Sequence, residues 1–316
     1  MFYYSTSETT SDPSIFNQEW ERFLATKEIN YCQIGKESYL DYEFNLIEEF
    51  SEQQSLRYRP YIKSVDRYEG CRPYHDNRIT LADGTEMSAS LAQFTEDHHF
   101  IAAQAPFKSN RHLFWQMILE KQINQIVMVT EFSESKNPKK ELAYPYFPLE
   151  TNEKVLLENG LEISTIEKSI LMSELEEFIE IRKINIQGDG INKIVTHYWY
   201  RNWLDDTAPN KTDTIFALIK RVEADKGLLN SNSPILVHCS AGVGRTGVFI
   251  ALYYLMQIKK SKDQKIDLFH FLGYLRWQRP YLVAVLPQYK FCYQIHALLE
   301  KRVDLPYSEE LYPIPS

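Results

Sequence analysis

The chain has 316 residues, enough for one large domain or two small ones. Apolar residues make up 44% of it and aromatic residues 14%, a composition that supports a packed core and argues against intrinsic disorder. The 35 basic and 43 acidic residues give a net charge of −8. That charge argues against a nucleic-acid-binding protein and against general binding to anionic membranes, although one local basic pocket stays compatible with it.

No apolar run reaches the ~18 residues that a membrane-spanning helix requires. The first ten residues lack the basic start and the apolar stretch of a secretory signal. The four cysteines, Cys32, Cys71, Cys239 and Cys292, are widely spaced, which indicates free thiols in a reducing compartment. We therefore expect a cytoplasmic monomer without a nucleic-acid partner. The many Asn, Ile, Lys and Tyr residues leave open a bacterial protein delivered into a host cytosol.

The N-terminal half of the chain predicts helices and short strands in turn. Asp12 and Pro13 are a helix-starting pair, and apolar residues follow them at helical spacing. The apolar run 126–129 is typical of a strand buried on both faces. The expected helices start at Asp12-Pro13, lie around 44–50, and follow a cap at Ser109 or Asn110; the expected strands are 77–81, 100–103 and 126–129.

The C-terminal half predicts antiparallel strands and then helices around one buried strand. Residues 144–200 contain several strand-like runs, with a clear turn at 188–190. A helical stripe at 215–222 should end at Gly227. The strand 235–237, the buried helix 248–258 and the helices 267–279 and 287–302 complete the expected elements. Since there is no repeat or linker, we expect a single domain at 12–302, a flexible N-terminus at 1–11 and a tail at 303–316.

Glycine is sparse in this chain, with 11 in 316 residues, yet three glycines lie in one ten-residue window. A loop that leads into a helix N-terminus directs backbone N–H groups at one point and binds anions there. The guanidinium of Arg245 can donate hydrogen bonds to two phosphate oxygens at once. Together with the helix dipole, its positive charge favours the thiolate form of Cys239 over the thiol. The window thus predicts a cysteine nucleophile facing a bound phosphate. It reads His238-Cys239-Ser240-Ala241-Gly242-Val243-Gly244-Arg245-Thr246-Gly247.

A nucleotide-binding loop is the main competing interpretation, but the window lacks the lysine of the GxxxxGK[ST] pattern. A buried cysteine is usually a small core residue, and this is our interpretation of Cys32, Cys71 and Cys292. His98 and His99 do not indicate a metal site, because neighbouring side chains on a strand point in opposite directions. We expect neither a metal ion nor a cofactor.

The window matches the phosphate-binding signature of the protein tyrosine phosphatases, and the resemblance extends in family order from about residue 12 to 302. Trp203-Leu204-Asp205 resembles the mobile Trp-Pro-Asp loop of that family, with Asp206 as the competitor for the general acid. The resemblance implies the phosphotyrosine-specific branch and an α/β fold with a twisted mixed central β-sheet flanked by α-helices. The other matching segments are Arg67-Tyr68 with Pro73-Tyr74 and Arg78, Ala103–Pro106, Phe114-Trp115, Glu134 with a lysine at 139 or 140, Arg276, Arg279 and Gln288-Tyr289.

The resemblance also implies a role for each site residue. Cys239 would attack phosphorus, and Asp205 would protonate the leaving tyrosine and then act as base toward water. Tyr68 would stack on the substrate ring and make the pocket deep, which selects phosphotyrosine, and the pH–rate profile would be bell-shaped and mildly acidic. Ser240, Ala241, Gly242, Val243, Gly244 and Arg245 would bind the phosphate, Thr246 and Gln288 would assist catalysis, and His238, Glu134 and Trp203 would support the site.

Four residues depart from the family pattern. Leu204 replaces the proline of the Trp-Pro-Asp loop, and Gly70 replaces an aspartate that binds the substrate backbone. Ala284 replaces a glutamine that positions the hydrolytic water, and Ala105 replaces a glycine. These departures leave two other functions open: a catalytically weak phosphotyrosine-binding module and a phosphoinositide phosphatase. The latter enzymes often carry lysines inside the loop.

Overall fold

The computed structural model describes residues 12–27, 36–93, 99–134, 137–172, 178–209, 211–229, 232–260 and 266–301. The expected flexible N-terminus and C-terminal tail, Cys32 and His98 lie outside these residues. The helices are α1 (Pro13–Ala25), α2 (Lys36–Gln53), α3 (Arg111–Glu120), α4 (Thr212–Leu229), α5 (Gly244–Lys260), α6 (Leu268–Gln278) and α7 (Leu286–Lys301), with short 3₁₀ turns at Ser55–Arg57, Glu69–Cys71 and Lys108–Asn110.

The strands form a large mixed sheet and a separate two-stranded one. The large sheet has the order β1-β2-β3-β11-β4-β10-β9-β8-β7. Its central strands β3, β11, β4 and β10 are parallel, and the flanking strands on both sides are antiparallel. The strands are β1 (Arg78–Thr80), β2 (Glu86–Gln93), β3 (His99–Ala103), β4 (Gln125–Met128), β5 (Ser133–Glu134), β6 (Asn137–Glu141), β7 (Lys154–Leu156), β8 (Glu162–Met172), β9 (Phe178–Gly188), β10 (Ile191–Tyr200) and β11 (Ile235–His238).

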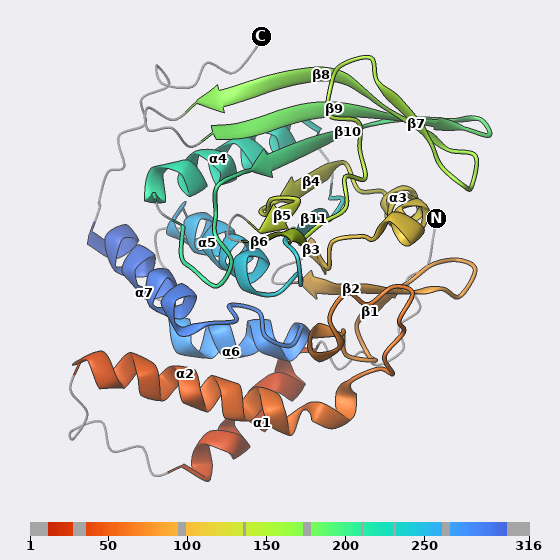
Figure 1. Cartoon of the computed structure of the whole chain (residues 1–316). Coiled ribbons are helices and arrows are strands. Elements are labelled where there is room, and N and C mark those ends of the chain that lie inside the picture. The colour runs from red at the N-terminus through yellow and green to blue at the C-terminus, as the bar shows by residue number, and fades with distance from the viewer. Residues whose placement is uncertain are drawn as a thin grey trace.

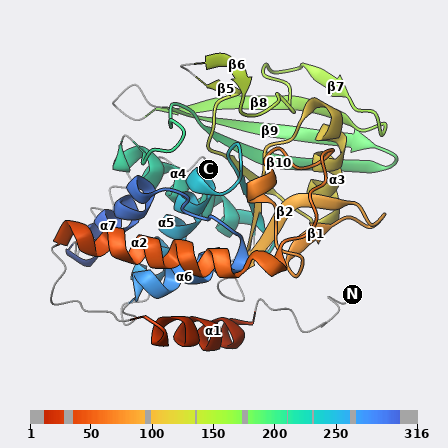
Figure 2. The same cartoon turned by 60° about the horizontal axis from the view of Figure 1, so that its bottom comes forward.

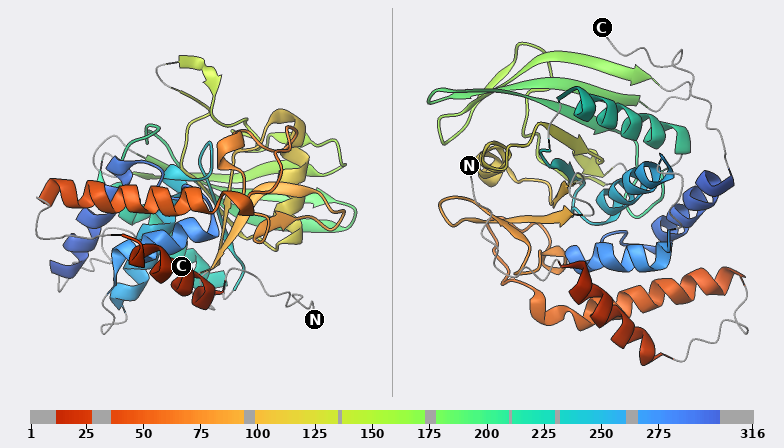
Figure 3. Two further views of the ribbon diagram at one scale, coloured as in Figure 1. Left: turned by 90° about the horizontal axis from the view of Figure 1, so that it is seen from below. Right: turned by 180° about the vertical axis from the view of Figure 1, so that it is seen from behind.

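Helices cover both faces of the twisted sheet (Figure 1). On one face α3 packs on the central strands through Phe114, Trp115 and Met117. On the other face lie α4, α5, α6 and α7, and α5 supplies the most completely buried apolar surface. Helices α1 and α2 pack outside α6 and α7 (Figure 3), while the β5–β6 pair stands out from the body of the molecule (Figure 2).

Most of the expected elements are confirmed, and two differences have a physical cause. The side chain of Asp12 accepts a hydrogen bond from Ser14 N at 2.8 Å and caps α1 as expected. Strand β2 was missed because its sequence, EMSASLAQ, has small residues of low β-propensity and no clear alternation. The expected helix end at Gly227 was wrong, since α4 continues through it to Leu229. A glycine inside a helix costs only about 1 kcal/mol relative to alanine.

The topology brings four loops to one edge of the sheet. Parallel strands end at the same edge, where loops that follow them form crevices suited to ligands. The loops after β3, β4, β10 and β11 therefore meet, and they contain, respectively, Gln104, Glu131, Asp205 and Cys239. The predicted nucleophile and the predicted acid lie on two of these loops.

Candidate active site

The loop between β11 and α5 holds the predicted nucleophile at its base. Cys239 follows the last residue of β11 and is 3% exposed. The backbone N–H of Gly242 points at its sulfur, with an N···Sγ distance of 3.2 Å. Helix α5 begins at Gly244, so its unpaired N-terminal amides face the same region. These donors stabilise a negative charge on the sulfur or on an anion bound above it.

Two glycines of the window 238–247, one in the loop and one in the first turn of α5, are required by close approach of other backbone segments. A Cβ atom on Gly242, whose φ is +69°, would lie 2.0 Å from the carbonyl oxygen of Ala103. A Cβ atom on Gly247 would lie 2.2 Å from the nitrogen of Val283. The concentration of glycine in this window thus follows from packing of the loop against β3 and against the segment before α7.

Arg279 holds the loop through its backbone carbonyls. Its Nε donates to the carbonyl of Gly242 at 2.8 Å, and one Nη donates to Ala241 O at 3.4 Å and to Cys71 O at 3.3 Å. Burial lowers the pKa of Arg279 to about 10, so the guanidinium stays charged at neutral pH. Because the loop carbonyls turn toward Arg279, the loop amides are free to face an anion. Sequence reasoning did not find this role, since it depends on a contact between distant segments.

Arg245 joins this loop to the predicted acid. One Nη donates to the carbonyl of Trp203 at 2.9 Å, and the other donates to Oδ1 of Asp205 at 2.8 Å. Arg245 is buried, whereas the Asp205 side chain is 33% exposed. Glu134, which the resemblance assigns to bracing Arg245, instead pairs with Lys140 at 2.9 Å. Bracing of Arg245 by Glu134 therefore stays a prediction.

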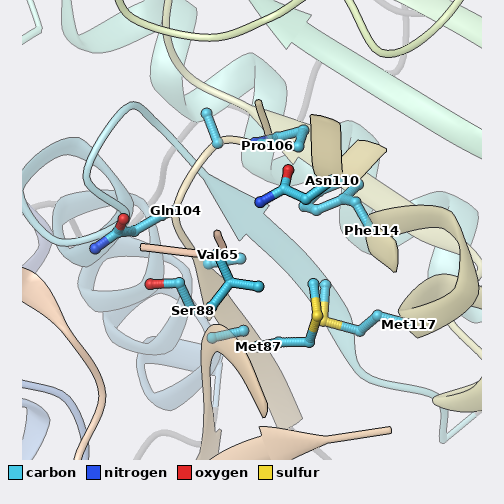
Figure 4. A pocket seen from close by; sticks show the side chains of 11 residues that line it. Val65, Met87, Ser88, Gln104, Pro106, Asn110, Phe114 and Met117 are labelled. Carbon is cyan, nitrogen blue, oxygen red and sulfur yellow. The ribbon is translucent and has the colours of Figure 1, made fainter. Parts of the chain in front are cut away.

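Tyr68 lies beside the loop and contacts Ser240. The hydroxyl of Ser240 donates to Leu142 O at 2.7 Å, so at 2.9 Å it accepts the hydrogen bond of the Tyr68 hydroxyl. Gln104 orders this segment, because its side-chain oxygen accepts from the backbone nitrogens of Arg67 at 2.6 Å and of Tyr68 at 3.1 Å. Figure 4 shows Gln104 at the edge of a small pocket beneath it, turned away from the methionines that line the interior.

A buried hydrogen-bonded chain supports the residue before the nucleophile. Nδ1 of His238 donates to Cys239 O at 3.0 Å, and its Nε2 accepts from the Tyr146 hydroxyl at 2.7 Å. The Tyr146 oxygen lies 2.9 Å from Nε2 of His197, which donates to it. Burial lowers the pKa of His238 to about 4 and that of His197 well below its usual value. Both histidines are thus neutral, and His238 positions the loop.

These two histidines predict a loss of stability in mild acid. The unfolded chain takes up protons near pH 6.5, whereas the folded chain excludes them, so stability falls as the pH decreases from about 6.5 toward 4. For His238, a pKa of about 4 corresponds to a loss on the order of 3 kcal/mol below that pH. Urea unfolding at pH 7.5, 6.5 and 5.5 measures this effect. A constant free energy of unfolding over that range would contradict it, because carboxylates titrate at lower pH.

Thr246 and Gln288 lie at the start of α5 and α7. The Thr246 hydroxyl is fully buried and has no hydrogen-bond partner among the described residues, so it is available to form a hydrogen bond with a group that enters the site. The buried side chain of Gln288 accepts from Ala284 N at 3.1 Å and donates to Thr207 O at 3.2 Å. Gln288 thus links α7 to the loop that carries Asp205.

The sequence of this chain matches a known protein family over most of its length. The family profile described as protein-tyrosine phosphatase matches residues 62–298. The chain belongs to the protein-tyrosine phosphatase family. The matched range includes each residue that sequence analysis assigned to the site, from Tyr68 to Gln288. Of the described helices, none is both long and apolar enough to cross a bilayer.

Several curated phosphatases are similar to this chain. Receptor-type tyrosine-protein phosphatase zeta of Rattus norvegicus is 29% identical over 260 residues, which are 78% of this chain and 11% of the relative. Tyrosine-protein phosphatase 69D of Drosophila melanogaster is 32% identical over 247 residues, which are 74% of this chain and 16% of the relative. Tyrosine-protein phosphatase non-receptor type 20 of Mus musculus is 28% identical over 259 residues, which are 80% of this chain and 57% of the relative. The chain thus spans only part of each relative.

Solved phosphatase structures share the fold. The catalytic domain of human protein tyrosine phosphatase non-receptor type 18 matches with a TM-score of 0.73 at 23% identity, over 83% of this chain and 96% of that structure. PTPN18 in complex with HER2-pY1248 phosphopeptides matches with a TM-score of 0.74 at 24% identity, over 83% of this chain and 99% of that structure. The expected fold, with a twisted mixed sheet between helices, is confirmed.

The structure gives a physical context for the departures from the tyrosine phosphatase pattern. Leu204 lacks the fixed φ of a proline, but Thr207 closes the loop. Its hydroxyl donates to Leu204 O at 2.9 Å, and its carbonyl accepts from Trp203 Nε1 at 2.9 Å. Gly70 has no heavy atom within 4 Å of an ideal Cβ position, so an aspartate would fit there.

The Ala284 departure predicts slow breakdown of a phosphatase intermediate. Ala284 has no side-chain amide to hold a water, and both polar atoms of the Gln288 side chain already bind backbone groups. Hydrolysis of a phosphocysteine should then be slower than its formation, so rapid mixing with a chromogenic aryl phosphate should give a burst equal to the enzyme concentration. Ala284→Gln should raise the steady-state rate about tenfold and reduce the burst. High turnover without a burst would contradict this prediction.

Proposed function

We propose that this chain is a protein tyrosine phosphatase that hydrolyses phosphotyrosine in proteins through a phosphocysteine intermediate. One observation carries the proposal: the Cys239 sulfur lies under the Gly242 N–H at the base of the loop, and Arg245 links that loop to Asp205. A thiolate, an anion-binding helix N-terminus and a guanidinium are the groups that phosphoryl transfer to sulfur requires. Residues 12–302 would form the single catalytic domain.

The proposed reaction starts when the phosphate enters the loop and displaces Asp205 from Arg245. The phosphate oxygens then accept hydrogen bonds from the loop amides and from the guanidinium. Cys239 attacks phosphorus as the bond to the tyrosine oxygen breaks, and Asp205, which takes up a proton from solvent after it leaves Arg245, donates that proton to the oxygen. Water then attacks the phosphocysteine with Asp205 as base. The sulfur leaves as a thiolate next to the Gly242 N–H and the Thr246 hydroxyl.

The proposed selectivity comes from the depth of the pocket. Tyr68 forms the wall beside the loop, and a phosphoserine side chain is shorter than a phosphotyrosine. Ser240 and Val243 offer no additional positive charge for the ring phosphates of a phosphoinositide. The proposed substrate is thus a phosphotyrosine-containing protein, and the related PTPN18 has been solved with phosphopeptides. We expect the enzyme to work as a monomer in a cytosol, without nucleic acid, metal or cofactor.

The deciding experiment is turnover of an aryl phosphate by the purified chain, with inhibition by orthovanadate. A panel of phosphotyrosine peptide, phosphoserine peptide and phosphatidylinositol phosphates then identifies the substrate class. Hydrolysis restricted to the phosphotyrosine peptide and the aryl phosphate supports the proposal. Peptide binding without any turnover would identify a binding module instead, and preference for the lipid would identify a phosphoinositide phosphatase.

A further inference from the structure

The acid loop, residues 201–209, begins in a strained conformation. Directly after β10 and Arg201, Asn202 adopts a left-handed conformation with a φ of +68°. The next residue, Trp203, already offers its carbonyl to Arg245. A non-glycine residue in the left-handed region is held there by its surroundings. The contacts of Arg201 and Asn202 therefore determine the direction in which the chain carries Asp205.

One carboxylate holds both residues at the start of this loop. Oε1 of Glu131 accepts from Nε of Arg201 at 3.1 Å and from the backbone nitrogen of Asn202 at 3.3 Å. Nη1 of Arg201 donates at 2.9 Å to Glu180. Glu131 follows β4 and Glu180 lies on β9, and these strands flank β10 in the sheet (Figure 1). The loop entrance is thus tied to both neighbours of its own strand.

The surroundings make these bonds stronger than those of an exposed ion pair. The side chains of Arg201 and Glu131 are 34% and 28% exposed, and that of Glu180 is 6% exposed. The Arg201 guanidinium also lies 4.5 Å from the centroid of the Trp199 ring. Charged hydrogen bonds between partly buried groups are screened less by salt than exposed pairs are. This network is therefore able to fix the loop entrance.

The network matters most after the substrate has bound. Asp205 is anchored by Arg245, which is the group that a phosphate needs. A bound phosphate takes that anchor away, whereas the bonds of Glu131 involve no phosphate-binding group. We propose that Glu131 is a positioning residue that keeps Asp205 directed at the leaving oxygen once the phosphate occupies Arg245. The proposal rests on the proposed function, since it needs Asp205 as the general acid.

The first test compares leaving groups. Proton donation matters for a leaving phenol of high pKa and little for one of low pKa. Glu131→Ala should lower kcat about tenfold for phenyl phosphate and less than about twofold for an aryl phosphate with an activated leaving group. Glu131→Gln, which keeps an acceptor oxygen, should recover part of the loss. An equal loss for both substrates, or no loss, would overturn the proposal.

A double variant tests whether Glu131 acts through Asp205. In an Asp205→Ala background, Glu131→Ala should have no further effect on phenyl phosphate turnover, because the group it positions is gone. A further tenfold loss in that background would overturn the proposal. The matched control is Glu19→Ala, which removes the exposed pair of Glu19 with Arg22 on α1 and should leave the leaving-group dependence as in the wild type.

Hydrogen exchange tests the same inference without any turnover. Glu131→Ala should speed exchange of backbone amides at 202–207 severalfold or more, while amides of β4 and β9 exchange as in the wild type. Unchanged exchange in the loop would overturn the proposal, and so would a general increase over the whole sheet. If the wild-type chain hydrolysed no aryl phosphate, the proposed function would fail, and the exchange measurement would still decide whether Glu131 holds the loop.

Discussion

Replacing Cys239 with serine should lower aryl-phosphate turnover by about 10⁴-fold or more, because a neutral hydroxyl is a far weaker nucleophile than a thiolate. The imidazole beside residue 239 is not available to activate a serine. His238, the adjacent imidazole, already donates through Nδ1 to Cys239 O and accepts through Nε2 from Tyr146. Steady-state kinetics on wild type and variant at pH 6 measure the loss.

A second buried cysteine provides the matched control. Cys292 on α7 is fully buried, and burial raises the pKa of its thiol to about 12, so it is no nucleophile at neutral pH. Cys292→Ala should cost stability and leave kcat within about threefold of the wild type. Thermal unfolding of the Cys239→Ser variant should match the wild type, which separates lost chemistry from lost folding. Turnover by Cys239→Ser at a tenth of the wild-type rate or more would exclude the proposed nucleophile.

The window from His238 to Gly247 was readable from sequence because its chemistry is local. A strand, a loop and a helix N-terminus follow one another without interruption, so the amides, Cys239 and Arg245 necessarily come close together. Most of the helices and several strands were predictable from the hydrophobic period, whereas the fold class was predicted from the family resemblance. The assignment of Asp205 needed the family resemblance, because 33 residues of chain lie between it and Cys239.

The roles that sequence analysis missed depend on distant partners. Arg279 binds the carbonyls of Gly242 and Ala241 from the end of α6, and Tyr146 bridges two histidines on different strands. Arg279 belongs to a segment that matches the family, but nothing in the sequence indicates its contact with the loop, and Tyr146 carries no signal of its own. Glu131 is similar, since its role depends on the left-handed turn at Asn202. Register and loop geometry, which local patterns do not specify, produce all three roles.

Replacing Asp205 with alanine should lower kcat for phenyl phosphate about 10²- to 10³-fold and remove the limb of the pH–rate profile that depends on the protonated acid. Binding should respond in the opposite direction. Asp205 and a phosphate compete for the Arg245 guanidinium, so loss of Asp205 should leave phosphopeptide affinity unchanged or increase it severalfold. The loss of chemistry comes from removal of the proton donor, and the gain of binding comes from removal of the 2.8 Å contact between Asp205 and Arg245.

Affinity is best measured without turnover, as the anisotropy of a labelled phosphotyrosine peptide with Cys239→Ser and with Cys239→Ser combined with Asp205→Ala. Asp206→Ala is the matched control, since Asp206 is adjacent and has no recorded bond to Arg245 among the described residues. It should change kcat by less than about fivefold. If Asp206→Ala caused the larger loss, the acid would be Asp206. If Asp205→Ala weakened phosphopeptide binding as much as turnover, Asp205 would be a substrate-binding group rather than the proton donor.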